Sequence, residues 1–128
     1  MNQVTAAIIE KNGEILIAKR KEGKHKGKWE FPGGKIEVGE SPEECLKREL
    51  NEEFNIETKI GPFLYSSKFV YDHISIELLA YKTYYISGDF KLNDHEEINW
   101  VSPKDFMQYD FLEADKPIVK RLMEGRIK

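Results

Sequence analysis

The segment from residue 41 to residue 55 constrains the fold more than any other part of this sequence. Ser41 is followed by Pro42 and then by Glu44, an arrangement that predicts the capped first turn of a helix. Asn55 tolerates a left-handed backbone and therefore predicts the helix end. The apolar residues of this helix fall on one side, and they are Leu46, Leu50 and Phe54. A helix of this kind must pack its apolar side against other structure.

Three glutamates form a row on the same helix. Glu49, Glu52 and Glu53 are spaced at i, i+3 and i+4, so their carboxylates gather on one side of a helix with about 3.6 residues per turn. Glu53 lies closest to the apolar side, where a carboxylate costs free energy unless a positive charge compensates it. Arg48 is expected on a different side of the helix from Glu52, so it cannot neutralise the whole row. A divalent cation such as Mg²⁺ would turn the repulsion into a binding site, but a solvated acidic face explains the spacing equally well.

Strand-like segments make up most of the remaining chain. They cover residues 4–11, 14–20, 29–31, 59–70, 74–86 and 98–101. Asn12-Gly13 predicts a hairpin turn between the first two, and residues 71–73 connect the two long strands. We expect a loop at residues 92–95, a second capped helix that begins at Ser102-Pro103, and a last helix over residues 116–124. Because no regular βαβ repeat is present, the sequence predicts an α+β fold with a mixed sheet packed between helices.

Length and composition limit the kind of protein. A chain of 128 residues with ordinary globular composition is expected to form one domain over residues 1–128. No apolar run approaches the roughly 18 residues of a membrane span, the N-terminus lacks a secretory signal, and the single Cys45 cannot form an internal disulfide, which together predict a cytoplasmic protein. A net charge of -3 argues against duplex nucleic acid as a partner. The basic run at residues 19–28 is either a solvated loop or a rim that faces phosphate groups.

The spacing around the three glutamates resembles the Nudix box. Gly34 is followed after five residues by Glu40 and after seven more by the run Arg48-Glu49-Leu50-Asn51-Glu52-Glu53-Phe54-Asn55-Ile56. The match covers residues 34–56, and its one departure is Asn55, where the family usually has glycine. The resemblance implies the Nudix-type α/β/α sandwich with a mixed β-sheet between helices. It also implies hydrolysis of a nucleoside diphosphate linked to some other group.

The same resemblance assigns roles to residues of the box. Glu49, Glu52 and Glu53 would hold Mg²⁺, with Mn²⁺ as a substitute, and the backbone carbonyl of Gly33 would complete the metal shell. Glu49 or a further acid would activate the attacking water. The structural positions of the motif are Gly34, Glu40 and Arg48, of which the last two would pair and brace the loop against the helix.

Residues 29–37, with the sequence WEFPGGKIE, resemble the MutT-type branch of the family. Members of that branch remove pyrophosphate from nucleoside triphosphates, including oxidised ones, and release the monophosphate. In that branch a fourth acid stands six residues before a tryptophan, and counting back from Trp100 gives Asp94. Glu96 and Glu97 are rivals for this role, although Glu96 is more simply explained as an exposed loop residue.

The branch also indicates where the substrate would bind. An arginine that ends the second strand and a histidine in the following loop contact the substrate there, and Arg20 and His25 occupy comparable places. The ordinary alternative for His25 is a solvated loop histidine. Further contacts are expected just before the box, at Glu30, Phe31, Pro32 and Gly33, although aromatic side chains on strands more often belong to the core.

Asp115 bears on the choice of nucleotide. Residues 114–119 resemble the segment whose asparagine reads the purine base in the 8-oxo-guanine enzymes. An ionised aspartate accepts hydrogen bonds but cannot donate them, so it suits the amino group of a cytidine nucleotide better than 8-oxo-dGTP. A protonated Asp115 would readmit the purine, and a helix cap before Lys116 is the ordinary alternative.

The sequence leaves other functions open. Within the family, the substrate could instead be a nucleotide sugar, a dinucleoside polyphosphate or capped RNA. A nucleotide-sensing module could also keep the fold without catalysis, although the intact row of acids argues against it. The expected partner is a nucleotide, and an exposed edge strand is compatible with either a monomer or a homodimer.

Overall fold

This computed structural model describes residues 2–125, in which α1 separates two groups of strands and three short helices follow the last strand. The strands are β1 (Asn2–Lys11), β2 (Glu14–Arg20), β3 (Trp29–Glu30), β4 (Glu57–Tyr71), β5 (Ile74–Ser87) and β6 (His95–Val101). The α-helices are α1 (Pro42–Phe54) and α2 (Lys116–Met123), and the 3₁₀ helices are η1 (Pro103–Gln108) and η2 (Glu113–Asp115). The predicted strands, the helix after Ser41 and the last helix are confirmed, mostly to within about two residues.

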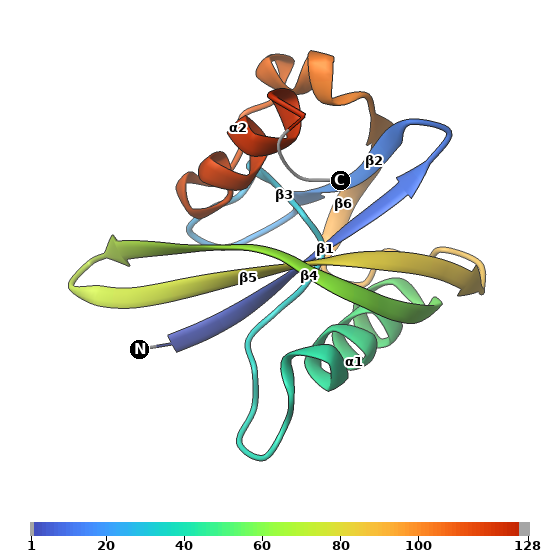
Figure 1. The fold of residues 1–128 in the computed structure, drawn as a ribbon, viewed down its shortest axis with the longest axis horizontal. Helices are drawn as coiled ribbons and strands as arrows, with labels where there is room; N and C mark the ends of the chain where they lie inside the picture. Colours follow the sequence, from blue (N-terminus) through green and yellow to red (C-terminus); the bar gives the residue numbers. More distant parts are fainter. Residues whose placement is uncertain (1, 126–128) are drawn as a thin grey trace.

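The strands form a mixed sheet in the order β3-β2-β1-β5-β4, and β6 pairs with β2 (Figure 1). β1 and β5 run parallel, with Asn2 to Ile9 opposite Ile76 to Thr83, while the other pairs are antiparallel. β1 and β2 pair next to their turn, where Asn12 and Gly13 both have positive φ, and then diverge. This turn geometry matches the twist of a tight hairpin, as the sequence predicted.

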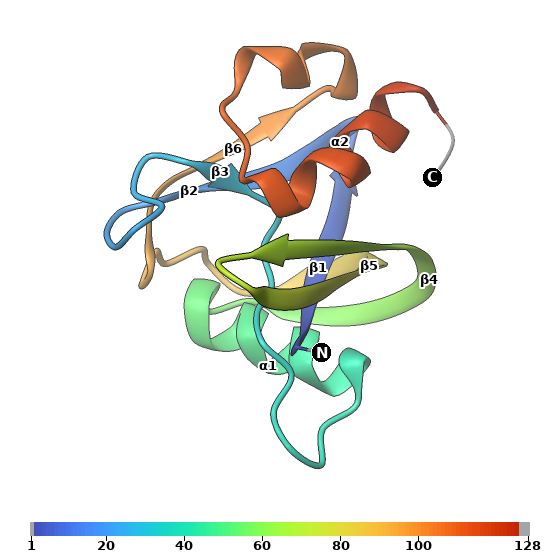
Figure 2. The ribbon, with the colours of Figure 1, turned by 90° about the vertical axis from the view of Figure 1, so that its left-hand side faces the viewer.

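Each face of the sheet carries its own apolar core. The core under α1 includes Ala7, Ile9, Leu16, Leu46, Leu50 and Phe54. The core under α2 includes Ala6, Ile8, Ile17, Ile118, Val119 and Leu122. Neighbouring residues of β1 and β2 point to opposite faces, which is why one short strand serves both cores. Figures 1 and 2 show α1 and α2 on opposite sides of the sheet, so the predicted α/β/α sandwich is confirmed.

Helix α1 begins and ends as its sequence predicts. The Ser41 hydroxyl accepts a hydrogen bond from the Glu44 backbone N–H at 3.0 Å, and the Glu44 carboxylate accepts one from the Ser41 N–H at 2.9 Å. Asn55 takes the left-handed conformation, with φ of 61°, and its N–H donates to the Asn51 carbonyl. These local interactions fix the length and orientation of the helix that carries the acid row.

Two predicted features differ in the structure. The segment that starts at Ser102 forms the 3₁₀ helix η1, closed by a hydrogen bond from the Asp105 N–H to the Ser102 carbonyl, and the Ser102 side chain makes no capping bond. His95 belongs to β6 rather than to a loop, because it pairs with Arg20 across the sheet. No helix within residues 2–125 is both long and apolar enough to span a membrane.

The helix end at Asn55 gives a test of the fold. In Asn55→Ala the side chain has a Cβ in a left-handed position, which costs about 1–2 kcal/mol, whereas Asn55→Gly is free of that cost. Both variants lose the hydrogen bond from the Asn55 amide to the Asp89 carbonyl, so they are a matched pair. We expect urea unfolding to give Asn55→Gly the larger free energy of unfolding, and equal values would contradict the role of Asn55 as a left-handed cap.

Candidate active site

A carboxylate cluster, formed by Glu30, Glu49, Glu53 and Asp94, lies where α1 faces the sheet. Glu53 is 9% exposed, and within residues 2–125 no lysine, arginine or histidine forms an ion pair with it. Burial, the adjacent Glu49 carboxyl and the charges of Glu30 and Asp94 together raise the pKa of Glu53 to about 9, and burial is the largest cause. The site therefore has a strong need for positive charge.

The glycine turn, Gly33–Gly34, packs directly against this cluster. A Cβ at Gly34 would lie 2.4 Å from the Glu49 carboxyl carbon, so only glycine lets the carboxylate approach this closely. A Cβ at Gly33 would lie 2.0 Å from the backbone carbonyl oxygen of Thr5 on β1. The turn is thus held between the sheet on one side and the acid row on the other.

Arg48 organises the exposed side of the acid row. Its guanidinium donates two hydrogen bonds to Glu40, at 2.6 Å and 3.0 Å, so the expected pair between loop and helix is present. The same guanidinium lies 2.9 Å from Glu49 and 3.3 Å from Glu52. The prediction that Arg48 and Glu52 lie on different sides was wrong, because residues four apart are separated by only about 40° on a helix. Hydrogen bonding from Arg48 lowers the pKa of Glu40 to about 2.

The donor set fits a hard divalent cation. Carboxylate oxygens are the ligands that Mg²⁺ and Mn²⁺ prefer, and Glu53 is a buried acid without a cationic partner among the described residues. As they stand, no three acidic, histidine or cysteine side chains in residues 2–125 converge tightly enough to hold an ion. Glu49 and Glu52 would have to turn away from Arg48 to do so. Asp94 is exposed at the edge of the cluster, while Glu96 pairs with Lys19 and stays outside it.

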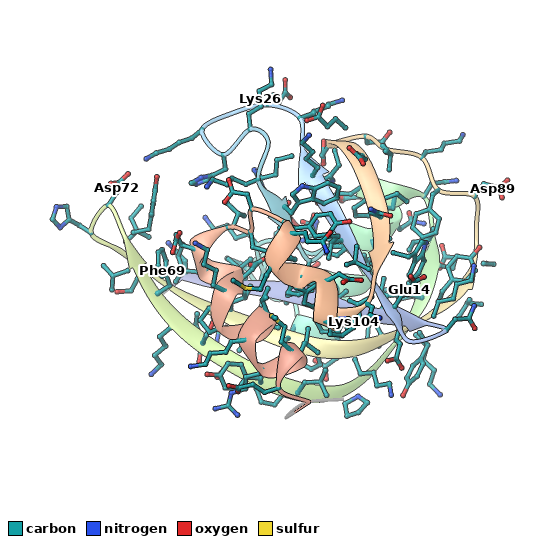
Figure 3. The ribbon with its side chains drawn as sticks, turned by 90° about the horizontal axis from the view of Figure 1, so that it is seen from above. Glu14, Lys26, Phe69, Asp72, Asp89 and Lys104 are labelled. Carbon is teal, nitrogen blue, oxygen red and sulfur yellow. The ribbon has the colours of Figure 1, made fainter. Side chains whose placement is uncertain are left out.

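A cavity of about 340 Å³ adjoins the cluster and shares Glu30 and the glycine turn with it. The β4–β5 hairpin contributes Phe69, Tyr71, Ile76 and Leu78, and the loop after β2 contributes His25 and Lys28. Figure 3 labels Lys26 on that loop and Phe69 and Asp72 on the hairpin. Lys24 pairs with Asp72, and the ring centroids of His25 and Tyr71 lie 5.4 Å apart. The loop after β2 therefore contacts the β4–β5 hairpin. The size and mostly apolar lining suit one nucleoside.

Asp115 lies in the wall of this cavity and is 5% exposed. Its carboxylate accepts a hydrogen bond of 2.9 Å from the backbone N–H of Phe31 and makes no capping bond to α2, so the capping alternative was wrong for the side chain. Burial raises the pKa of Asp115 well above its usual range, and the charge of Glu30 acts in the same direction. This shift favours the protonated carboxyl, which can donate as well as accept a hydrogen bond.

Glu30 connects the cavity with the carboxylate cluster. Its carboxylate contacts Arg20 at 3.1 Å and the buried His95 ring at 2.8 Å, and His95 stacks on Phe54 at the end of α1. Arg20 lines the cavity, and its predicted contact with the substrate stays a prediction. Sequence reasoning missed His95, and its position next to Asp94 was the one sequence signal near it, because its pairing with Arg20 on the neighbouring strand is visible only in the structure.

The predicted contacts before the box separate into two groups. Glu30, Phe31 and Gly33 line the cavity, although the Phe31 ring also packs in the core against Phe106 and Phe111. Pro32 is buried and outside the cavity lining, and its carbonyl accepts a hydrogen bond from the Ala7 N–H. Pro32 therefore attaches the glycine turn to β1.

The close contact at Gly34 gives a test of the metal site. In Gly34→Ala the new methyl meets the end of a flexible side chain, so we expect near-normal stability but a displaced Glu49 carboxylate and about tenfold weaker Mn²⁺ binding by electron paramagnetic resonance. In Gly33→Ala the methyl meets the backbone, so thermal unfolding should show a loss of about 1–3 kcal/mol. Unchanged Mn²⁺ affinity in a folded Gly34→Ala protein would contradict this assignment.

Comparison with known proteins agrees with the fold and with the motif. The NUDIX domain model matches residues 1–122. The chain is 37% identical over 127 residues to "CTP pyrophosphohydrolase" of Escherichia coli (strain K12), covering 98% of this chain and 94% of that protein. It is 31% identical to "8-oxo-dGTP diphosphatase" of the same organism, covering 94% and 95% of the two chains.

A solved structure has a similar fold. The solution structure of the E. coli ORF135 protein superposes with a TM-score of 0.86 at 36% identity and covers 98% of this chain and 91% of that one. The likeness in fold therefore extends over nearly the whole chain. The chain belongs to the NUDIX domain family of hydrolases.

Proposed function

We propose that this protein is a Mg²⁺-dependent, MutT-type pyrophosphohydrolase that converts a nucleoside triphosphate into the monophosphate and pyrophosphate. The observation that supports this proposal most strongly is that the carboxylate cluster and the cavity lie directly next to each other. A buried acid cluster that needs a divalent cation shares Glu30 and the glycine turn with a cavity large enough for one nucleoside. Phosphates of a nucleotide whose base occupies the cavity would therefore reach the acids. Both E. coli relatives bear names that describe hydrolysis of a nucleoside triphosphate.

The acid row would hold the metal in this proposal. Glu49, Glu52 and Glu53 would be the ligands, with the Gly33 carbonyl and Asp94 beside them, and Mn²⁺ would substitute for Mg²⁺. A bound divalent cation draws charge from phosphate oxygens and lowers the pKa of bound water. Glu49 would then accept a proton from the attacking water.

The basic rim and the cavity wall would orient the nucleotide. Arg20 and His25 line the cavity and would bind the phosphates or sugar, while Lys28 adds charge at the rim. Asp115 would read the base. The raised pKa of Asp115 favours its protonated form, which would both donate and accept, so a carbonyl of 8-oxo-guanine and the amino group of cytosine are both compatible with it. We therefore propose cytidine nucleotides and 8-oxo-dGTP as the two substrate candidates.

Glu53→Gln tests the acid row. We expect Mg²⁺-dependent hydrolysis to fall at least about 100-fold, since the substitution removes a ligand charge while it keeps the side-chain shape. The folded pKa of Glu53, near 9, exceeds its unfolded value of 4.5, so the stability of the metal-free wild type falls as pH rises between these values. Glutamine does not titrate, so the variant should gain stability over the wild type between pH 5 and pH 8. A stable variant with wild-type turnover would refute the role of Glu53.

Asp115→Asn tests how the base is read. The asparagine oxygen can still accept the hydrogen bond from Phe31, so we expect the variant to fold. The ratio of kcat/KM for 8-oxo-dGTP to that for CTP should change at least about tenfold, because an amide always donates and cannot ionise. Asp89→Asn is the control, since Asp89 is exposed. It lies across the molecule from Asp72, which marks the hairpin that lines the cavity (Figure 3). An unchanged ratio would mean that Asp115 does not read the base.

Product analysis separates the main proposal from its alternatives. Monophosphate plus pyrophosphate is the expected pair, whereas monophosphate plus orthophosphate, or turnover confined to nucleotide sugars, dinucleoside polyphosphates or capped RNA, would favour another Nudix activity. Tight nucleotide binding without turnover of any of these would favour a sensing module. We further propose that residues 1–128 act as a single domain, because both cores are shared by strands from the whole described chain.

A further inference from the structure

Thr5 is a buried polar residue in an otherwise apolar part of β1. It is 2% exposed, and the four residues after it are Ala6, Ala7, Ile8 and Ile9, all buried. A valine would suit this position of a central strand at least as well. A buried hydroxyl is retained at such a place without cost only when it is hydrogen bonded. Its partners therefore indicate what it does.

The Thr5 hydroxyl binds both polar backbone groups of one residue in the glycine turn. It donates to the Gly34 carbonyl at 3.1 Å and accepts from the Gly34 N–H at 3.4 Å. The backbone N–H of Thr5 donates to the same carbonyl at 2.8 Å. One side chain thus fixes both the position and the rotation of the Gly34 peptide groups relative to β1.

Helix α1 reaches the same point from the other side. The Cys45 thiol lies 3.3 Å from the Thr5 hydroxyl and 3.5 Å from the Gly34 carbonyl, and it is fully buried. The strand, the turn and the helix therefore meet at three polar atoms, and the Arg48 guanidinium lies 3.9 Å from the Cys45 thiol. Four residues further along α1, the Glu49 carboxylate touches Gly34 so closely that no Cβ would fit.

A small movement of the turn would change the acid site. The Gly33 carbonyl and the Glu49 carboxylate come from different elements, and Gly34 is the contact between them. Functional groups must be held to within about 0.5 Å of their productive geometry, and groups behind the ligands supply that precision. Without the Thr5 hydroxyl, the Gly34 carbonyl would keep its hydrogen bonds from the Thr5 N–H and the Cys45 thiol, but the Gly34 N–H would lose the hydroxyl as its acceptor.

We propose that Thr5 is a positioning residue for the metal site: its hydroxyl holds the glycine turn so that the Gly33 carbonyl and the Glu49 carboxylate can serve one cation. This inference rests on the proposed function for the cation, but the orientation of the turn can be measured without turnover. Thr5 borders the cavity proposed for the nucleoside but is only 2% exposed, and it is assigned no contact with the phosphates or with the cation. Its effect passes through Gly34.

Three variants of Thr5 separate positioning from packing. Thr5→Val keeps the shape and removes the hydroxyl, Thr5→Ser keeps the hydroxyl and removes a methyl, and Thr5→Ala removes both. Three measurements apply to each variant: hydrogen exchange of the Gly34 amide in the metal-free protein, Mn²⁺ affinity by electron paramagnetic resonance, and kcat with KM for the nucleoside triphosphate. Thermal unfolding checks that each variant is folded.

In Thr5→Val we expect exchange at Gly34 at least about tenfold faster, Mn²⁺ binding about tenfold weaker and kcat reduced by at least about tenfold, with KM within about threefold of the wild type. Thr5→Ser should restore all of these to within about threefold. If Thr5→Val does not fold, Thr5→Ala tests the same loss of the hydroxyl. A folded variant that lacks the hydroxyl but keeps wild-type exchange and Mn²⁺ affinity would overturn the inference.

The outcomes also distinguish this inference from the proposed function. If the wild type hydrolyses no nucleoside triphosphate, the proposed function fails, while exchange at Gly34 and Mn²⁺ affinity still decide the role of Thr5. If the wild type is active and Thr5→Val matches it in all three measurements, Thr5 is merely a packing residue and the proposed function stands.

Discussion

Burial of the Glu53 carboxyl beside Glu49 is the interaction on which the rest of this site depends. An ionised carboxylate in a partly dry environment costs several kcal/mol unless it has a positive partner, and a second acid nearby increases that cost. The fold tolerates this arrangement because α1 is stabilised locally by its caps and by three fully buried apolar residues, Leu46, Leu50 and Phe54. The helix can therefore carry a destabilising group that a divalent cation would stabilise.

The two-faced sheet brings the acids and the cavity together. Asp115 directly precedes α2 on one face, whereas Glu49 and Glu53 belong to α1 on the other. Glu30, from the short strand β3, lies between them, and its charge raises the pKa of both Glu53 and Asp115. A ligand with a base at one end and phosphates at the other matches this layout when a divalent cation supplies the positive charge that the cluster requires. The base end would then form hydrogen bonds in the cavity.

Local signals in the sequence predicted much of this structure. The capping box at Ser41, the Asn55 helix end and the Asn12-Gly13 turn each depend on residues a few positions apart, so they could be predicted from short segments. The hydroxyl of Thr5 and the ring of His95 could not, because their partners lie 29 and 65 residues away in the chain. The raised pKa of Asp115 likewise depends on burial that only tertiary structure creates.

Anomalous X-ray scattering from Mn²⁺, in crystals grown with a nucleoside triphosphate analogue that resists cleavage, tests most directly whether buried acids on α1 bind the metal. We predict a manganese peak in contact with the carboxylates of Glu49 and Glu53, with the triphosphate beside it and the base next to Asp115. A peak at the exposed end of the acid row that leaves Glu53 without a metal contact, or a base bound outside the cavity, would contradict the site described for this protein.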